Sequence, residues 1–252
     1  MTSPFDLTGK VALVTGANTG IGQGLAIGLA AAGADIAAVG RSAPADTKAE
    51  VERFGRRFAF VEADLSTIEH VADIVAQTEQ ALGPVNVLVN NAGTIKRNDA
   101  LDFTEADWDA VIDVNLKTLF FLSQAVARGM VAGKRSGKII NIASMLSFQG
   151  GIRVASYTAS KSGVAGLTKL LANEWAAKNI NVNAIAPGYI ATNNTAALRA
   201  DEKRNAEILA RIPAGRWGAP GDLAGAAVFL ASSASDYVHG TTLAVDGGWL
   251  AR

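Results

Sequence analysis

The sequence predicts an α/β fold in which one parallel sheet carries helices on both faces. Short apolar runs alternate with helix-length segments along the whole chain, a pattern typical of parallel strands joined by helical crossovers. The runs are continuously apolar, which indicates strands that are buried on both faces. No repeat and no Pro- or Ser-rich linker divides the 252 residues, so we expect a single doubly wound domain over residues 1–252.

Seven apolar runs are expected to be the strands of that sheet, and six segments between them are long enough to be helices. The expected strands are Val11–Thr15, Asp35–Val39, Arg57–Val61, Val85–Val89, Lys138–Ala143, Asn181–Ala186 and Thr242–Val245. The expected helices are Ile21–Ala32, Thr47–Phe54, Thr67–Leu82, Glu105–Met130, Ser156–Lys178 and Asp222–Ser232. Open parallel sheets bind ligands beyond the carboxyl ends of their strands, so the residues that follow each strand are the first candidates for a site.

Composition excludes several classes of site and partner. The chain has no cysteine, and its two histidines, His70 and His239, lack metal-ligand spacing, so we expect no disulfide, no thiolate catalysis and no metal. Basic and acidic residues number 23 each, a balance that favours neither nucleic acid nor an acidic membrane as partner. The start lacks the features of a signal peptide, and the most apolar window, Gly24–Gly40, is interrupted by Asp35 and by glycines. We therefore expect a cytoplasmic protein without a membrane segment.

The first expected strand is followed by a glycine-rich turn, Thr15–Gly22 (TGANTGIG), which opens a helix. Glycines let the backbone approach a pyrophosphate, whose charge the helix N-terminus stabilises. The spacing is G-x-x-x-G-x-G and differs from the commoner G-x-G-x-x-G, so by spacing alone an ordinary glycine-rich turn would also explain it. Its position after the first strand favours a dinucleotide site.

Three further strand ends carry residues that suit the rest of a dinucleotide. About twenty residues after the glycine turn, where an NAD site places an acid, the chain has Gly40, Arg41 and Ser42. Arg41 could pair with a 2′-phosphate, or it could be an exposed loop cation. Asp64 could accept a hydrogen bond from the adenine amino group, or it could be a solvated loop residue. The small residues of Asn90–Gly93 (NNAG) would let backbone lie against a ribose.

A serine, a tyrosine and a lysine follow the fifth expected strand at a spacing that suits proton transfer. Ser144 comes directly after the strand, and Tyr157 and Lys161 are one helical turn apart, so their side chains share a helix face. An ammonium beside a phenol favours the phenolate, which makes Tyr157 a candidate proton donor or acceptor. Three polar residues at the start of an ordinary helix are the alternative explanation.

Asn115 is unusual because it lies inside the expected helix Glu105–Met130, in VNLKT. Asparagine is a poor residue for a helix interior, since its amide competes for backbone groups. A buried functional role and a satisfied structural amide would each explain it. After the sixth strand, the segment from Pro187 to Thr192 (PGYIAT) is expected to pass the site as a loop.

These motifs, TGANTGIG, NNAG, Asn115, Ser144, YTASK and PGYIAT, occur in an order that resembles the short-chain dehydrogenase/reductase family from about Gly9 onward. The resemblance implies a Rossmann-type fold and a nicotinamide-dependent oxidoreductase with the tetrad Asn115, Ser144, Tyr157 and Lys161. It implies that Ser144 binds the substrate oxygen, that Tyr157 exchanges a proton with it, that Lys161 lowers the tyrosine pKa and holds the nicotinamide ribose, and that Asn115 supports a water relay. The residues implied to contact the cofactor are Gly16, Asn18, Thr19, Gly20, Ile21, Gly22, Arg41, Asp64, Leu65, Asn91, Ala92, Gly93, Tyr157, Lys161, Pro187, Gly188, Ile190 and Thr192.

The chemistry agrees with these implied roles. A phenol that acts as a base near neutral pH needs its pKa lowered by about 2–3 from its ordinary value of about 10. We expect Lys161 and the positive nicotinamide ring, in a site shielded from water, to lower the pKa of Tyr157 to that extent.

Longer tracts, such as NIASMLSFQGGIRV and NVNAIAPGYIATNNT, resemble the sugar-acid dehydrogenases of the same family. They imply interconversion of a ketone and a secondary alcohol on a six-carbon 3-deoxy sugar acid, with NAD as the expected cofactor and NADP possible. Arg97, Arg153 and Arg216 are candidates to meet the substrate carboxylate, and Gln149 to meet a hydroxyl, although each could be a surface residue. The alternatives are a reductase of other carbonyls (acyl-carrier ketones, steroids or ketoses) and a non-catalytic nicotinamide-binding regulator, against which the complete tetrad argues.

Two segments suggest how the site closes and how chains assemble. Residues 193–213, which are charged and helix-prone, are expected to form a mobile lid over the substrate, with an ordinary surface helix as the alternative. In this family the C-terminal tail meets a neighbouring subunit, and the long helices that correspond to Glu105–Met130 and Ser156–Lys178 pair between chains. The resemblance therefore implies a homotetramer.

Overall fold

The computed structural model describes residues 3–252, and it confirms the predicted sheet. Seven parallel strands follow the order β3-β2-β1-β4-β5-β6-β7. Chain order reverses between β1 and β4, which pair side by side in the middle of the sheet. The strands are β1 Val11–Thr15, β2 Asp35–Gly40, β3 Phe58–Glu62, β4 Val87–Asn90, β5 Gly137–Ile142, β6 Ile180–Pro187 and β7 Thr242–Val245.

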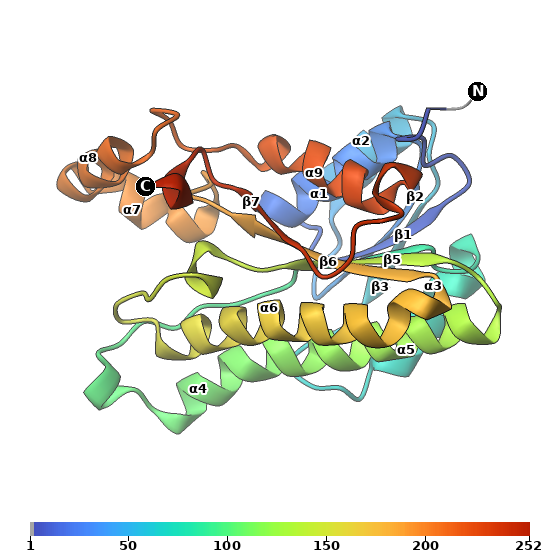
Figure 1. Cartoon of the computed structure of the whole chain (residues 1–252), viewed down its shortest axis with the longest axis horizontal. Coiled ribbons are helices and arrows are strands. Elements are labelled where there is room, and N and C mark those ends of the chain that lie inside the picture. The colour runs from blue at the N-terminus through green and yellow to red at the C-terminus, as the bar shows by residue number, and fades with distance from the viewer. Residues whose placement is uncertain (1–2) are drawn as a thin grey trace.

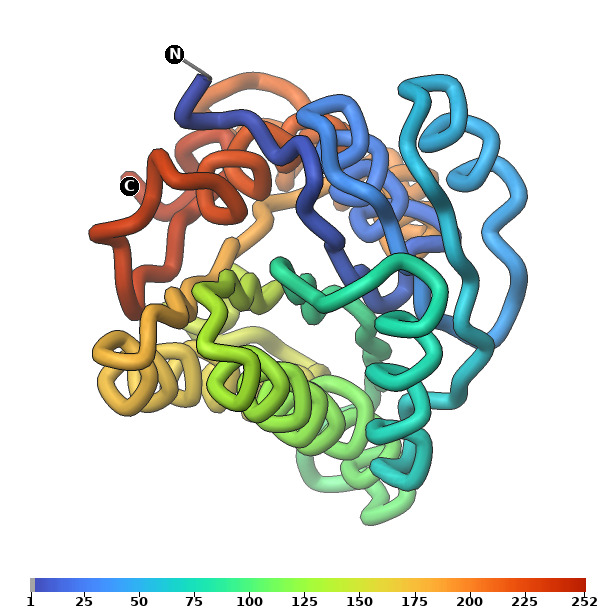
Figure 2. Tube along the Cα trace, turned by 90° about the vertical axis from the view of Figure 1, so that its right-hand side faces the viewer, coloured from blue at the N-terminus to red at the C-terminus, as the bar shows by residue number. Residues whose placement is uncertain are grey.

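Helices cover both faces of the sheet, as predicted (Figures 1 and 2). One layer contains α1 and α9, which pack on the central strands with α2 beside α1, and the other contains α3, α4, α5 and α6. The α-helices are α1 Gly20–Ala31, α2 Ala45–Arg53, α3 Val71–Leu82, α4 Glu105–Ile112, α5 Thr118–Ala132, α6 Ala155–Trp175, α7 Ala196–Ala200, α8 Glu202–Arg211 and α9 Ala224–Ala231.

Burial along the strands follows their position in the sheet. Every residue of β1, β4, β5 and β6 is buried, which explains why these runs are mostly apolar in the sequence. The buried polar exceptions in these strands include Asn90, Lys138, Asn141, Asn181 and Asn183. The edge strands β3 and β7 are only partly buried, since each has one neighbour strand. Two separate apolar cores result, one on each face of the sheet.

The structure differs from the predicted helices in the segment Glu105–Met130. It is interrupted by a π-helical stretch, Asp113–Lys117, which lies between α4 and α5 and contains Asn115. A π-helical insertion shifts the side chains by part of a turn, and such insertions are frequent at functional sites. Helix periodicity in the sequence does not reveal this single extra residue per turn.

Residues Glu105–Ala132 are together long and apolar enough to cross a membrane by length and composition alone. In the structure, α5 packs against α3, β4 and β5, and its apolar residues Leu122, Val126 and Met130 are buried in one of the two cores. The core helix of a folded domain has the same composition, so this segment is accounted for by packing inside the fold.

Candidate active site

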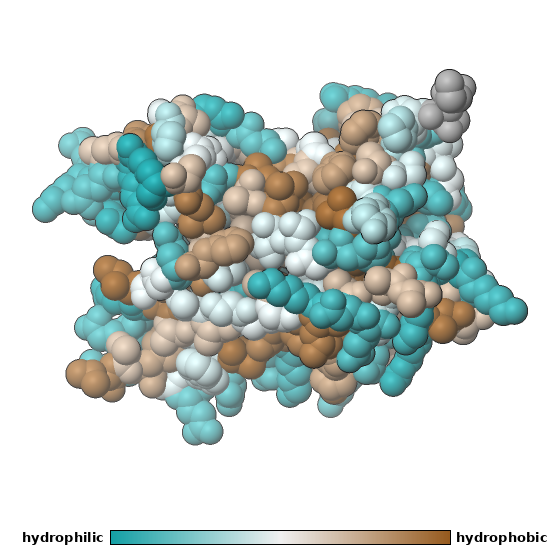
Figure 3. Space-filling model, in the orientation of Figure 1, coloured by the Kyte–Doolittle hydropathy of each residue, from teal (hydrophilic) through white to brown (hydrophobic). Residues whose placement is uncertain are grey.

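A cleft of about 1000 Å³ opens beyond the carboxyl ends of the strands, where the reversal of strand order leaves room between loops. Each of the first six strands contributes lining residues from the loop that follows it. The segment with α7 and α8 stands over one end of the cleft, and the molecular surface is hollowed beneath it (Figure 3). All predicted cofactor residues line the cleft except Pro187 and Ile190. Both are buried, and Ile190 packs in the apolar core instead.

The glycine turn forms one wall of the cleft and has the geometry that a pyrophosphate requires. Gly16 has a φ of 65°, which favours glycine. A side chain on Gly22 would overlap the Gly16 carbonyl oxygen and the Asn91 amide nitrogen. That amide donates to the carbonyl oxygens of Thr15 at 2.9 Å and Gly16 at 3.2 Å, so the turn is tied to the end of β4. The cradle at the start of α1 therefore stays open, and a dinucleotide fits it.

The far end of the same wall carries the residues expected at the adenosine. Asn18 donates to the Ser42 hydroxyl at 3.3 Å, beside Arg41, and all three line the cleft. The backbone amide of Ser66 donates to Asp64 at 2.9 Å, and this bond, helped by the Ser66 hydroxyl, lowers the pKa of Asp64. An ionised Asp64 suits an acceptor for the adenine amino group.

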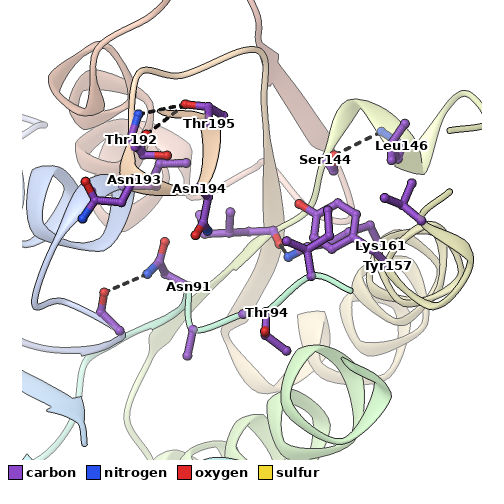
Figure 4. A pocket seen from close by; sticks show the side chains of 18 of the residues that line it. Asn91, Thr94, Ser144, Leu146, Tyr157, Lys161, Thr192, Asn193, Asn194 and Thr195 are labelled. Carbon is purple, nitrogen blue, oxygen red and sulfur yellow. Dashed lines mark hydrogen bonds between the residues drawn. The ribbon is translucent and has the colours of Figure 1, made fainter. Parts of the chain in front are cut away.

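Ser144, Tyr157 and Lys161 converge on the middle of the cleft from β5 and α6 (Figure 4). The Ser144 hydroxyl caps the short helix Met145–Ser147 by accepting from the Leu146 amide at 3.2 Å, which leaves its proton free to donate. Tyr157 lies beside Ser144, with its hydroxyl on the serine side (Figure 4). The Lys161 ammonium lies 5.6 Å from the centre of the tyrosine ring.

The pKa values of the pair differ from the expected pattern. Burial raises the pKa of Tyr157, and the Ser144 hydroxyl and the Arg97 charge oppose that rise only in part. The Lys161 ammonium donates to the Ile142 carbonyl oxygen at 2.6 Å, and no hydrogen bond joins it to the phenol. Burial also lowers the pKa of Lys161 to about 8. Tyr157 is therefore a neutral phenol at pH 7 in this structure, which can give a proton but cannot take one.

Asn115 is buried, and its amide connects three parts of the chain around the cleft. The side-chain oxygen accepts from the Thr94 amide at 2.8 Å. The side-chain nitrogen donates to the Thr94 carbonyl oxygen at 3.0 Å and to the Ser160 hydroxyl at 3.2 Å. Asn115 thus fixes the loop after β4 against the helix that carries Tyr157. The π-helical stretch explains how its side chain leaves the helix interior to do so.

The structure separates the predicted substrate residues into two groups. Arg97 and Gln149 line the cleft together with Ser144. Arg153 and Arg216 do not line it, contrary to the prediction. Arg153 pairs with Asp99 at 3.0 Å, and Arg216 pairs twice with Asp222, at 2.7 and 3.0 Å, so both guanidinium groups are engaged elsewhere on the surface.

Sequence reasoning missed several residues of the cleft. Thr94, Asn194, Arg211 and Trp249 line it from four different segments. Asn194 and Thr94 flank Asn91 and Lys161 (Figure 4). Periodicity gives no signal for such residues, because each reaches the cleft through the path of a loop or the tilt of a short helix. Trp249, near the end of the chain, is 5% exposed and packs in an apolar cluster of its own chain.

Comparison with known proteins places this arrangement in a family. A family model described as Enoyl-(Acyl carrier protein) reductase matches residues 16–250. The chain is 62% identical over 250 residues to 2-dehydro-3-deoxy-D-gluconate 5-dehydrogenase of Escherichia coli (strain K12), with 99% of each sequence covered.

Two solved structures are also similar to this chain over nearly its full length. A protein from Agrobacterium tumefaciens, proposed to be a 2-deoxy-D-gluconate 3-dehydrogenase and solved with bound NADP, is 61% identical with a TM-score of 0.92, and 100% of each chain is covered. A gluconate 5-dehydrogenase from Burkholderia cenocepacia, solved with NADP and tartrate, is 41% identical with a TM-score of 0.92, covering 99% of this chain and 98% of that one. The chain belongs to the short-chain dehydrogenase/reductase family.

Proposed function

We propose that this protein is an NAD(P)-dependent dehydrogenase that interconverts a secondary alcohol and a ketone on a sugar acid of the 2-dehydro-3-deoxy-D-gluconate type. Support comes from curated relatives that carry this activity in their names and match the chain over nearly its full length, at 62% identity for the E. coli enzyme and 57% for that of Bacillus subtilis. A reductase of other carbonyls is the alternative, and the name of the family model mentions one such activity.

The convergence of Ser144, Tyr157 and Lys161 beside the glycine turn carries this proposal. A bound nicotinamide cofactor would supply or accept the hydride. In the reducing direction, the neutral Tyr157 phenol donates its proton to the substrate oxygen while the Ser144 hydroxyl hydrogen-bonds to the same oxygen. Oxidation needs the phenolate, which the charges of Lys161 and Arg97 would stabilise once the Lys161 ammonium turns from Ile142 toward the phenol.

For the cofactor, we propose that the protein uses NAD and accepts NADP as well. The strand β2 ends at Gly40 without a carboxylate, so a 2′-phosphate meets no acidic repulsion from this strand end. Arg41, Ser42 and Asn18 together offer a guanidinium, a hydroxyl and an amide at that end of the cleft. The relatives from A. tumefaciens and B. cenocepacia were both solved with NADP. Comparison of kcat/KM for NADH and NADPH decides the preference.

Turnover of 2-dehydro-3-deoxy-D-gluconate with NAD or NADP, followed by absorbance of the reduced nicotinamide, tests the proposed activity. We expect Tyr157→Phe to lower kcat by about 10²–10⁴-fold, because proton transfer is lost. Cofactor affinity of this variant should stay close to that of the wild type. Turnover of acyl-carrier ketones or neutral ketoses in place of the sugar acid would favour the alternative, and full activity of the variant would refute the mechanism.

We also propose that the protein forms a homotetramer through the layer of α4, α5 and α6. Three large apolar side chains, Trp108, Val131 and Leu170, are 41–46% exposed on these helices. A side chain added at Gly166 of α6 would meet open space, which leaves this part of the helix free for close approach by another helix. Sedimentation equilibrium gives the mass directly, and a monomer at micromolar concentration would contradict the proposal.

A further inference from the structure

The segment with α7 and α8 rests on a small apolar cluster of its own beside the cleft. The cluster contains Met145, Ile208, Ile212 and Trp249, with Tyr189, Leu198, Trp217 and Leu250 against it. The C-terminal Arg252 donates to the Ala210 carbonyl oxygen at 2.6 Å, so the tail fastens the end of α8. Residues close to the C-terminus thereby determine where the last turn of α8 lies relative to the cleft.

Arg211, the last residue of α8, is held in place by neutral groups. Its guanidinium carbon lies 4.0 Å from the centre of the Trp249 ring, which corresponds to a stacked cation–π contact. One of its nitrogens donates to the Gln149 side-chain oxygen at 3.3 Å, and the Trp249 indole points at the same oxygen from 3.4 Å. All three side chains line the cleft.

No carboxylate pairs with Arg211 among residues 3–252, although two other cations of the cleft, Lys96 and Arg204, have such partners. Lys96 pairs with Asp107, and Arg204 of the same helix pairs with Glu207, both at 3.1 Å or less. The Arg211 guanidinium carries five donors and makes one hydrogen bond to the described residues. The remaining donors are available to an anion in the cleft.

Arg41 and Arg97 also line the cleft without a carboxylate partner among the described residues. Arg41 lies beside Ser42 at the adenosine end, so Arg97 is the arginine to compare with Arg211. The charge of Arg97 opposes the rise in the pKa of Tyr157. Both arginines are exposed, but no hydrogen bond or aromatic contact within the described residues holds the Arg97 guanidinium. Arg211 is fixed by stacking and by Gln149, so it loses less side-chain freedom when it binds an anion. A fixed planar guanidinium also matches the two oxygens of a carboxylate.

We propose that Arg211 binds the carboxylate of the substrate, and that Trp249 and Gln149 are the positioning residues that aim its guanidinium into the cleft. This inference rests on the proposed sugar-acid activity. It places recognition of the substrate carboxylate on the segment 193–213. The substrate would then contact Arg211 of α8 through its carboxylate, and Ser144 and Tyr157 through its reacting oxygen. This assignment also makes the C-terminal Trp249 a determinant of selectivity for acids.

The test compares a charged substrate with a neutral one in three variants. We would measure kcat/KM for 2-dehydro-3-deoxy-D-gluconate and for its methyl ester, with saturating cofactor, in Arg211→Met, Arg97→Met and Arg204→Met. Arg204 is the matched control because it lies on the same helix and lines the cleft but is paired. We expect Arg211→Met to lower kcat/KM for the acid by about 10- to 100-fold, mainly through KM, and for the ester by less than about threefold.

A second measurement does not need turnover of the sugar acid. Tartrate, an inert dicarboxylate, is titrated into the complex with NADP, and its affinity is measured by calorimetry. Arg211→Met should weaken tartrate binding by about tenfold or more, and Gln149→Met by less, with the double variant no worse than Arg211→Met alone.

These outcomes separate the two proposals. A wild type that does not oxidise the sugar acid, but whose tartrate binding still depends on Arg211, would refute the proposed function and leave the anion site standing. Equal losses on acid and ester in Arg211→Met, or a loss selective for the acid only in Arg97→Met, would overturn the assignment of the carboxylate to Arg211. Unchanged tartrate affinity in Arg211→Met would overturn it as well.

Discussion

The cofactor half and the substrate half of the cleft differ in what holds their residues in place. The cofactor half consists of strand ends and the glycine turn, and its contacts run between backbone groups and short side chains, such as Asn91 and Thr15. The substrate half consists of long side chains, Arg97, Gln149 and Arg211, which come from three separate segments. A site made of backbone changes little from one substrate to another, whereas long side chains on a separate segment can change specificity while the fold stays the same.

The largest expected effect is a loss of cofactor binding in the cofactor half of the cleft. In Gly22→Ala the new methyl group would overlap the Gly16 carbonyl oxygen, so the turn must move. We expect a loss of about 1–3 kcal/mol in the free energy of unfolding, and at least a similar loss in cofactor binding, or about 5- to 150-fold. Gly225→Ala on α9, where a methyl group meets open space, serves as the control and should be neutral or slightly stabilising. Unchanged cofactor affinity in Gly22→Ala would show that the turn does not cradle the pyrophosphate.

The next effect concerns Lys161, which lies in the middle of the cleft between the cofactor half and the substrate half. The unfolded chain keeps the Lys161 proton up to a pH of about 10.5, whereas burial lowers the folded pKa to about 8. Between these values the unfolded chain binds more protons, so the contribution of this group to stability rises with pH across that window. At pH 7 the burial of the ammonium costs the folded protein about 3 kcal/mol.

We therefore expect Lys161→Met to be inactive but more stable than the wild type at pH 7 in urea unfolding, and to lose the rise in stability between pH 8 and 10.5. The control is Lys169→Met, an exposed lysine on the same helix, which should change stability by less than about 0.5 kcal/mol. A variant at Lys161 that is less stable than the wild type at pH 7 would contradict the cost assigned to the ammonium.

A smaller effect would sharpen the adenosine end of the cofactor half. Arg41→Ala removes the cation proposed to meet a 2′-phosphate, so we expect kcat/KM for NADPH to fall by about tenfold. The value for NADH should change by less than about twofold. Arg53→Ala, an exposed arginine of α2 paired with Glu50, controls for loss of a surface charge nearby. Equal changes with both cofactors would show that Arg41 does not contact the phosphate.

The smallest effect tests the substrate half alone. Arg252→Ala breaks the bond that ties the C-terminus to α8 at Ala210. We expect KM for the sugar acid to rise by about two- to fivefold, since one exposed hydrogen bond contributes about 0.5–1 kcal/mol. Cofactor affinity, measured by nicotinamide fluorescence, should not change. A parallel change in cofactor affinity would mean that the two halves of the cleft are coupled through α8.

Most of the cofactor half could be predicted from the sequence because its residues follow the strands directly. An apolar run that is buried on both faces forms a strand inside a parallel sheet. The residue that follows the strand therefore lies at the carboxyl edge of the sheet. The positions of Gly16, Asp64, Asn91 and Ser144 at that edge follow from the strands, whereas their roles came from the resemblance to the family. Tyr157 and Lys161 could be placed together because a four-residue step on a helix brings side chains to one face.

The substrate half was decided only by the tertiary structure. Arg153 and Arg216 have the same charge and similar positions beside motifs as Arg97, but Asp99 and Asp222 pair with them, and no local pattern reveals such partners. Arg211 reaches the cleft because α8 packs on Met145 and Trp249, more than thirty residues away in either direction. The direction of the Lys161 ammonium, toward Ile142, likewise depends on a carbonyl of the neighbouring strand. Local sequence determines on which face of a helix or strand a side chain lies, whereas long-range packing determines which groups that side chain contacts.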